Sequence, residues 1–133
     1  MPITHRVNTE RRVLLVTREG SISRDEEEAS LRARKQDPSV VSGMPVLVDS
    51  RSVHPPDSVS TVRYLADVVT HNANRLDCGP LALVVGSPVQ YGMARMYIAL
   101  TELAHPATQV FTSYEEAISW LATGTAGAGS GPE

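Results

Sequence analysis

The chain has 133 residues, a formal net charge of −3 and charged residues of both signs along its length. This length suits one domain with a single hydrophobic core, and the charge pattern lacks the basic surface that nucleic-acid-binding proteins need. No apolar run approaches the roughly 20 residues that span a bilayer, and the first residues lack the apolar core of a signal peptide. The single cysteine, Cys78, excludes an internal disulfide. We therefore expect a cytoplasmic protein without transmembrane segments.

The N-terminal third of the chain predicts a β-hairpin followed by a charged helix. Residues 3–7 and 13–17 are β-type runs separated by a polar stretch. Ser23 and Glu26 then form a capping-box pattern, with acids in the first turn and bases in the last, which complements the helix dipole. Since this helix has few apolar residues, we expect its charges to form a solvated face rather than a surface for a partner.

A second apolar run, residues 44–49, predicts a central strand that ends in Asp49. After two prolines, Asp57 or Ser58 is expected to cap the next helix, which ends near residues 74–78 before Gly79 and Pro80. The predicted buried stripe of this helix consists of Val59, Val62, Leu65, Ala66, Val69, Ala73 and Leu76.

Residues 81–104 form the clearest strand-to-helix unit of the sequence. The apolar run 81–85 suits a strand covered on both faces, and Ser87, followed by Pro88, is a typical helix start. Gln90 is placed to complete a capping box with Ser87. The stripe expected to lie on the sheet consists of Val89, Met93, Met96, Tyr97, Leu100 and Ala104.

The remaining elements are a strand at residues 108–111 and a helix that a third capping box, Ser113 with Glu116, begins. The predicted domain covers residues 1–122, and the Gly/Ala-rich residues 123–133 are expected to be a flexible tail. The element order β-β-α-β-α-β-α-β-α predicts an α/β fold with a mostly parallel five-stranded sheet and an antiparallel edge strand.

This order is also that of the STAS domain, the module of anti-sigma-factor antagonists and of sulfate transporter tails. Further similarity lies in GMPVLVD at residues 43–49, in Asp57-Ser58, in PVQYGMARMY at residues 88–97, in Val110-Phe111 and in EAISWL at residues 116–121. With these motifs the chain resembles a bacterial group of small STAS-like proteins that is also related to the CRAL-TRIO lipid-binding fold. The resemblance covers nearly all of the chain before the tail and implies the fold more than a function.

The sequence contains no catalytic motif, metal-ligand spacing or nucleotide-binding glycine pattern, so we expect no enzyme activity, metal or cofactor. The nearest group of chemically capable residues is Asp49, His54, Asp57 and Ser58. A Ser–His–Asp arrangement would require hydrogen-bond contact and an oxyanion hole, and the sequence indicates neither. Because α/β folds bind ligands at the carboxyl ends of their strands, Asp49, His54 and Ser87 are candidates for a ligand end of the sheet.

Three hypotheses for function follow. The resemblance implies first a regulatory, protein-interaction module switched by phosphorylation at Ser58, next to Asp57, although Val59-Ser60 replaces the small residue and glycine usual there. The alternative, a carrier of a small apolar ligand or lipid, requires a cavity of a few hundred Å³. With one Phe and one Trp in the chain, a filled core is the expectation. An enzyme of unknown type is the third hypothesis.

Apolar residues off the two buried stripes predict an interface. The candidates are Tyr64, Val68, Tyr91, Ala94, Arg95 and Ile98. Aromatic and aliphatic groups with arginine at the margin have the composition of an interface centre. We expect a homodimer slightly ahead of a different protein partner, since two-fold dimers are the commonest oligomers. In the alternative, a neighbouring helix or the tail covers this surface within one chain.

Overall fold

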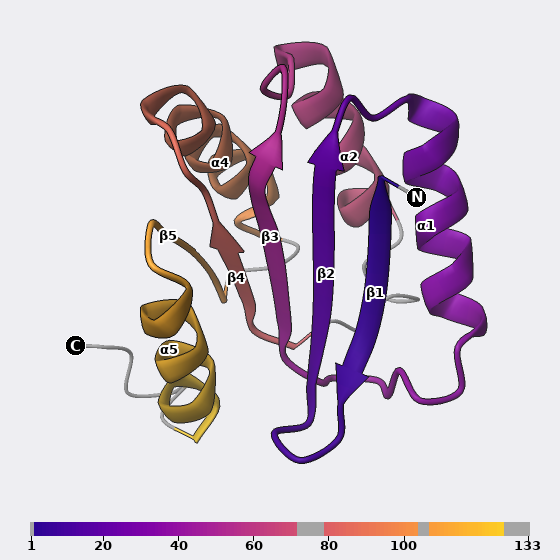
Figure 1. The fold of residues 1–133 in the computed structure, drawn as a ribbon, viewed down its shortest axis with the longest axis vertical. Helices are drawn as coiled ribbons and strands as arrows, with labels where there is room; N and C mark the ends of the chain where they lie inside the picture. The colour runs from indigo at the N-terminus through magenta and orange to yellow at the C-terminus, as the bar shows by residue number, and fades with distance from the viewer. Residues whose placement is uncertain (1, 72–78, 104–106, 127–133) are drawn as a thin grey trace.

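The computed structural model describes residues 2–71, 79–103 and 107–126. Its strands and helices follow the order expected from the sequence (Figure 1). In chain order they are β1 (Ile3–Asn8), β2 (Val13–Gly20), α1 (Arg24–Gln36), β3 (Val46–Val53), α2 (Val59–His71), β4 (Leu81–Val84), α4 (Pro88–Thr101), β5 (Thr108–Phe111) and α5 (Tyr114–Ala126).

The five strands form one sheet in the order β1-β2-β3-β4-β5. The hairpin pairs β1 with β2 antiparallel, and every later pair is parallel. Arg12 closes the hairpin in the left-handed region at φ 58°, with its N–H donating to Asn8 O. The mostly parallel sheet with one antiparallel edge strand is therefore confirmed.

The strand order decides on which side of the sheet the helices lie. The chain adds each parallel strand next to the previous one, so three right-handed crossovers in the same direction place α1, α2 and α4 on a single face. Helix α5 follows the last strand and packs on the opposite face, against β3, β4 and β5 (Figure 1). Three helices thus cover one face of the sheet, and α5 packs on the other.

Strand alternation divides the core into two clusters. Leu15, Leu47 and Val84 point to the α5 side, where Ala117 and Leu121 cover them. The neighbours of these residues along each strand point to the three-helix side. The buried members of the cluster on that side are Ile3, Leu14, Val16, Val46 and Leu81. The aromatic pair Phe111 and Trp120, with ring centroids 5.7 Å apart, packs on the α5 side.

Serine side chains cap the helices as the sequence predicts. Ser23 forms the complete capping box with Glu26. Ser58 Oγ accepts from Thr61 N at 3.1 Å, and Ser87 Oγ accepts from Gln90 N at 3.1 Å. The predicted reciprocal bond from Gln90 to Ser87 is wrong, because Gln90 Oε1 accepts instead from Gly86 N.

The predicted buried face of α4 is wrong in part. Tyr97 of the predicted stripe does pack against the core, but Leu100 is 47% exposed and Val89 is 54% exposed. The buried residues of this helix are Gln90, Ala94 and Thr101. The rotation is set by polar contacts: Gln90 Nε2 donates to Ser50 O and Val53 O, which fixes the first turn of α4 against the end of β3. An apolar stripe could not reveal this contact.

Two element boundaries lie further along the chain than predicted. Strand β3 continues through Val53, so Asp49 lies within the strand and not at its end. Helix α5 continues to Ala126, so the first four residues of the predicted tail are helical. The predicted end of α2 at residues 74–78, including Cys78, and the rest of the tail fall outside the described residues.

We predict that two helical leucines, Leu121 of α5 and Leu100 of α4, differ in their contribution to stability. Leu121 is 1% exposed in the α5 cluster, so Leu121→Ala should lower the free energy of unfolding by about 2–5 kcal/mol. Leu100→Ala should cost below about 0.5 kcal/mol because its side chain remains half in water. Urea denaturation measures both, and a large loss at Leu100 would contradict the orientation of α4.

Candidate functional site

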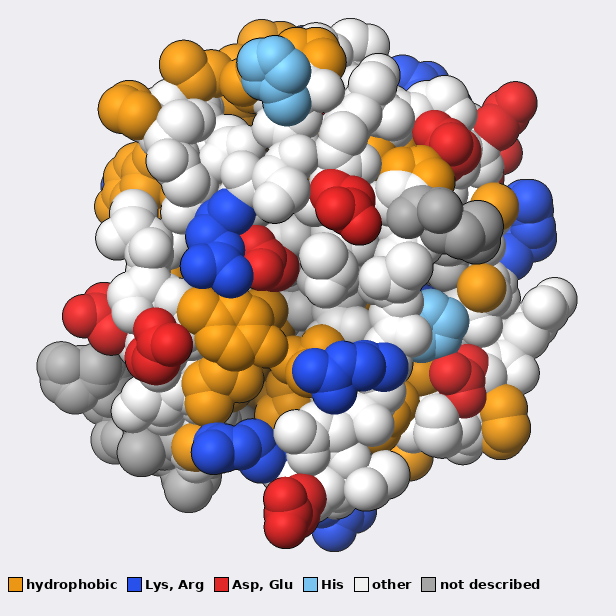
Figure 2. Space-filling view, viewed as in Figure 1, with side chains coloured by type: hydrophobic (Ala, Val, Ile, Leu, Met, Phe, Trp, Pro, Cys, Tyr) orange, Lys and Arg blue, Asp and Glu red, His pale blue; other side chains and the backbone are white. Residues whose placement is uncertain are grey.

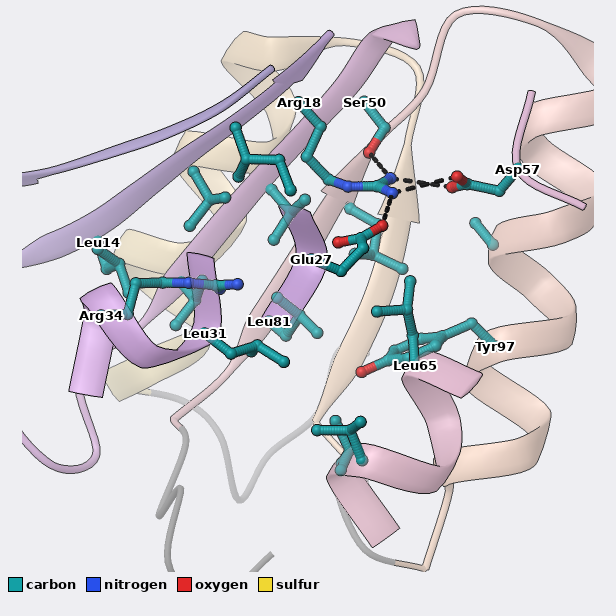
Figure 3. Close-up of a pocket in the computed structure, with 18 of the residues that line it drawn as sticks. Leu14, Arg18, Glu27, Leu31, Arg34, Ser50, Asp57, Leu65, Leu81 and Tyr97 are labelled. Carbon is teal, nitrogen blue, oxygen red and sulfur yellow. Dashed lines mark hydrogen bonds and ion pairs between the residues drawn. The ribbon is translucent and has the colours of Figure 1, made fainter. Parts of the chain in front are cut away.

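A cavity of about 430 Å³ lies between the sheet and helices α1, α2 and α4. Its floor is aliphatic, and its helix side carries Leu31, Leu65 and Tyr97 (Figure 3). The expectation of a filled core is therefore wrong on this side of the sheet. The physical reason is side-chain size, because inward-facing positions of α2 and α4 include the short residues Val62, Val68 and Ala94, while Phe111 and Trp120 pack on the other face.

A buried arginine forms the polar end of the cavity. Along β2, Leu14, Val16 and Arg18 follow the period of two that places them on the three-helix side. Arg18 is only 7% exposed. Figure 3 shows its guanidinium extending across the end of the cavity toward Glu27 of α1 and Asp57, just before α2.

Arg18 binds three partners from three different segments. Its Nη1 donates to Asp57 Oδ2 at 2.9 Å and to Ser50 Oγ of β3 at 3.1 Å. Its Nη2 donates to Asp57 Oδ1 at 3.1 Å and to Glu27 Oε2. We call these four residues, Arg18, Glu27, Ser50 and Asp57, the Arg18 cluster. Through it, the guanidinium connects β2, β3, α1 and the start of α2.

The two carboxylates hold the buried guanidinium in its charged form. Burial by itself would lower the pKa of Arg18, but the hydrogen bonds and charges of Asp57 and Glu27 outweigh burial and raise that pKa above its usual value. One donor is left over: Arg18 Nε is buried and has no hydrogen-bond acceptor among the described groups. A buried donor without an acceptor is costly, so Nε adds to the energetic cost of burying this guanidinium.

Of the residues that the sequence singled out for a ligand end or a switch, only Asp57 lines the cavity. Asp49 points to the α5 side with Leu47, and its carboxylate binds Arg51 through two bonds of 2.8 and 2.9 Å. Burial acts to raise the pKa of Asp49, but the bonds from Arg51 lower it below its usual value. Asp49 therefore faces away from the Arg18 cluster.

The remaining candidates take separate positions. Ser58 and Ser87 cap α2 and α4, and His54 is exposed after β3. Since Asp57 binds Arg18, and Ser58 Oγ donates to Thr61 Oγ1, the four residues considered for catalysis form no Ser–His–Asp arrangement. Among the described residues, no group of three or more His, Cys, Asp or Glu side chains is arranged to hold a metal ion.

The predicted interface residues do not form one outward surface. Tyr64 packs against α1, with Arg24 over its ring at 4.1 Å and its hydroxyl donating to Glu28. Val68 and Ala94 line the cavity, and Ala94 is only 8% exposed. Tyr91 and Arg95 are exposed on α4, and Ile98 is half-buried. Self-association through the exposed part of α4 stays a prediction.

Sequence reasoning missed the residues at the polar end of the cavity, although signals for two of them were present. Arg18 continues the inward alternation of Leu14 and Val16, one residue beyond the predicted end of the strand. Glu27 lies four residues before Leu31 and so shares its helix face. The sequence contains no comparable signal that Gln90 faces the cavity, since a capping role already accounted for a glutamine at this position.

The surface in the view of Figure 2 shows basic and acidic side chains interspersed, with no continuous basic area on that face. Hydrophobic side chains gather toward the lower left of this face, beside α5 (Figures 1 and 2). In the described part of the chain, no helix has the length and apolar character needed to cross a membrane.

In a comparison with protein families, residues 41–124 match the family described as "Domain of unknown function (DUF7793)". The chain belongs to this family. The matched region begins before β3 and includes Ser50, Asp57 and all of α2 and α4, whereas Arg18 and Glu27 precede it. A comparison with curated proteins finds no significant match.

Among solved structures, the chain is similar to the crystal structure of an uncharacterized protein from the DUF3478 family with a SpoIIAA-like fold, from Shewanella loihica PV-4. The TM-score is 0.60 over 90% of this chain and 91% of that chain, with 12% sequence identity. The DUF7793-family chain thus has a STAS-like fold, as its sequence motifs predicted. At this identity the likeness concerns the fold alone.

We predict strong energetic coupling between Arg18 and Glu27. Arg18→Met should lower the free energy of unfolding by about 3–5 kcal/mol, because it leaves buried carboxylate charge without its partner. Adding Glu27→Leu should recover part of that loss, giving a coupling of about 1–3 kcal/mol in a double-mutant cycle measured by urea denaturation. The same cycle for the exposed Arg51 with Asp49 is the control and should give a smaller coupling. Additive effects at Arg18 and Glu27 would contradict the cluster.

Proposed function

We propose that this STAS-like chain is a non-enzymatic binding module that takes a small, largely apolar molecule into the cavity between the sheet and helices α1, α2 and α4. The observation that carries the proposal is the cavity itself, about 430 Å³ in volume. Pockets that hold small molecules are typically about 300–1,000 Å³, so the volume suits one.

The lining supports an apolar ligand. Aliphatic side chains of β2, β3 and β4 form one wall, and Leu31, Leu65 and Tyr97 contribute from the three helices (Figure 3). The Arg18 cluster contributes polar groups to this lining, and Arg34 and Lys35 of α1 contribute two further basic side chains. Apolar walls with a few polar groups are the usual arrangement in sites where the walls give affinity and the polar groups orient the ligand.

We predict that filling the cavity from α4 abolishes binding. Ala94 lines the cavity and is buried, so Ala94→Phe should occupy the ligand's space and lower the affinity for the uncharged fluorescent probe Nile red at least about tenfold. The matched control is Ala99→Phe on the exposed side of the same helix, which should bind Nile red like the wild type.

Both variants should be folded by circular dichroism before binding is compared. A wild-type protein that does not bind Nile red, or an Ala94→Phe variant that binds it as tightly as Ala99→Phe, would overturn the proposal. Mass spectrometry of the native protein purified from its own host would then identify a copurified ligand in the supported case.

A second candidate function is a regulatory interaction switched at Ser58, which the exposed position of this serine favours. Its hydroxyl lies at the start of α2, where the helix dipole stabilises added negative charge. Asp57, its neighbour, binds Arg18. A phosphate at Ser58 would therefore add charge directly beside the Arg18 cluster and provide a link between modification and the cavity.

The expected observation is a phosphate on Ser58 in intact and peptide mass spectra of the protein from its own host. Ser58→Ala should remove that modification and also lose about 1 kcal/mol of stability, because Thr61 N loses its acceptor. The control is Ser60→Ala, at an exposed serine in the same turn, which should change neither the modification of Ser58 nor the stability of the protein. An unmodified Ser58 under all growth conditions would eliminate this candidate.

A further inference from the structure

Resting on the proposed apolar-ligand function, we propose that the ligand carries an anionic head, which Arg34 and Lys35 of α1 bind while its apolar tail occupies the cavity. The class of ligand is then a single-chain amphiphile with a negatively charged head, such as a long-chain carboxylate. The charged side chains that line the cavity, and their order along α1, support this choice.

One side of α1 changes from acidic to apolar to basic along the cavity wall. Glu27, Leu31 and Arg34 are spaced by four and three residues, so they share one side of the helix, and Lys35 follows Leu31 by four. All four residues line the cavity. Glu27 and Arg34 are two turns apart, about 10 Å along the helix axis. Figure 3 shows Glu27 at the Arg18 cluster and Arg34 away from it. The two ends of this wall therefore differ in charge.

The charges of the lining favour an anion at one end of the cavity. Among the described residues, five charged side chains line it: Arg18, Glu27, Arg34, Lys35 and Asp57. Three of them form the ion pairs of the Arg18 cluster, in which one positive charge faces two negative ones. The other two side chains are both basic. An anionic head is thus repelled by the surplus negative charge of the Arg18 cluster and attracted by Arg34 and Lys35.

The exposure of the two basic residues also suits a charged head. Lys35 is exposed and Arg34 is half-buried, whereas Arg18 and Glu27 are only 7% and 4% exposed. A carboxylate bound by Arg34 and Lys35 keeps contact with water, while one placed beside Arg18 would lose its hydration. The head therefore lies toward the C-terminal part of α1, and the tail lies along the aliphatic floor that the strands provide.

The guanidinium of Arg34 has enough donors to bind a head group in addition to its contacts within the chain. Its Nε–H donates to Ser30 O of the same helix at 3.4 Å. A guanidinium has five N–H donors in one plane, so it can bond to a carboxylate alongside the partners that it already has. Lys35 adds a second positive charge at the next position of α1.

The test compares decanoate, 1-decanol and decylammonium, which share a tail and differ in the head, by displacement of Nile red from the full chain at neutral pH. Decanoate should bind at least about tenfold more tightly than 1-decanol, the scale of one charge-assisted hydrogen bond. Decylammonium should bind more weakly than decanoate, because its head has the same sign of charge as Arg34 and Lys35. Equal or tighter binding of 1-decanol or of decylammonium would overturn the inference.

The variant Arg34→Gln tests the main head-group residue, since glutamine removes the charge and keeps a polar side chain. It should bind Nile red and 1-decanol like the wild type, while the preference for decanoate over 1-decanol falls about tenfold. Lys35→Gln should lower that preference by a smaller factor, because water weakens the attraction of an exposed charge.

The matched control is Arg32→Gln, which removes the same charge from an exposed position on the opposite side of α1. This variant should keep the wild-type preference for decanoate. A loss as large as that of Arg34→Gln would overturn the inference, because the net charge of the chain would then explain the preference. An unchanged preference in Arg34→Gln would overturn it as well.

The two proposals fail separately. If the wild type does not bind Nile red, the apolar-ligand function itself is wrong. If Nile red binds but decanoate does not displace it more tightly than 1-decanol does, only the head-group assignment is wrong. Should Arg34→Gln not fold by circular dichroism, the ranking of the three amphiphiles on the wild type and the effect of Lys35→Gln still decide the inference.

Discussion

The arrangement of the three-helix side depends on one buried guanidinium. Arg18 lies near the end of β2, and a charge in that position is tolerated only with its partners in place. Glu27 and Asp57 must both reach it, so α1 and the start of α2 are held around the same point at the end of the sheet. Since several inward-facing positions of α2 and α4 hold short side chains, among them Val62, Val68 and Ala94, space beside the cluster is left open as the cavity.

The strand order and the alternation of side chains separate this polar site from the rest of the core. Because three crossovers run in one direction, the helices that surround the cavity share a face, and α5 covers an apolar cluster with aromatic side chains on the other. Neighbouring residues of β3 consequently serve different sides: Asp49 pairs with Arg51 toward α5, while Ser50 binds Arg18. The polar residues of β3 can therefore be assigned to a site only once the face of the sheet to which each points is known.

Local signals predicted the fold almost completely, whereas the site depended on contacts between distant segments. Apolar runs and capping serines are local, and they gave every described strand and helix in order. The orientation of α4 was missed because the Gln90 amide, and not an apolar stripe, fixes its first turn against β3. The cavity was missed because a composition with one Phe and one Trp does not say on which face of the sheet they lie.

The placement of the buried polar groups is explained better by a binding site than by a contribution to stability. Apolar residues of similar volume are often as stabilising as a buried ion pair, or more so, and a filled core avoids the cost of unpaired atoms. Among the described residues, the buried charged side chains are those of Arg18 and Glu27, and they lie on the side of the sheet that also holds the cavity, together with Gln90. The α5 side has an apolar cluster with aromatic side chains packed against it. Polar groups beside an open apolar volume support the proposed ligand site, because in such sites apolar walls give affinity and a few polar groups orient the ligand.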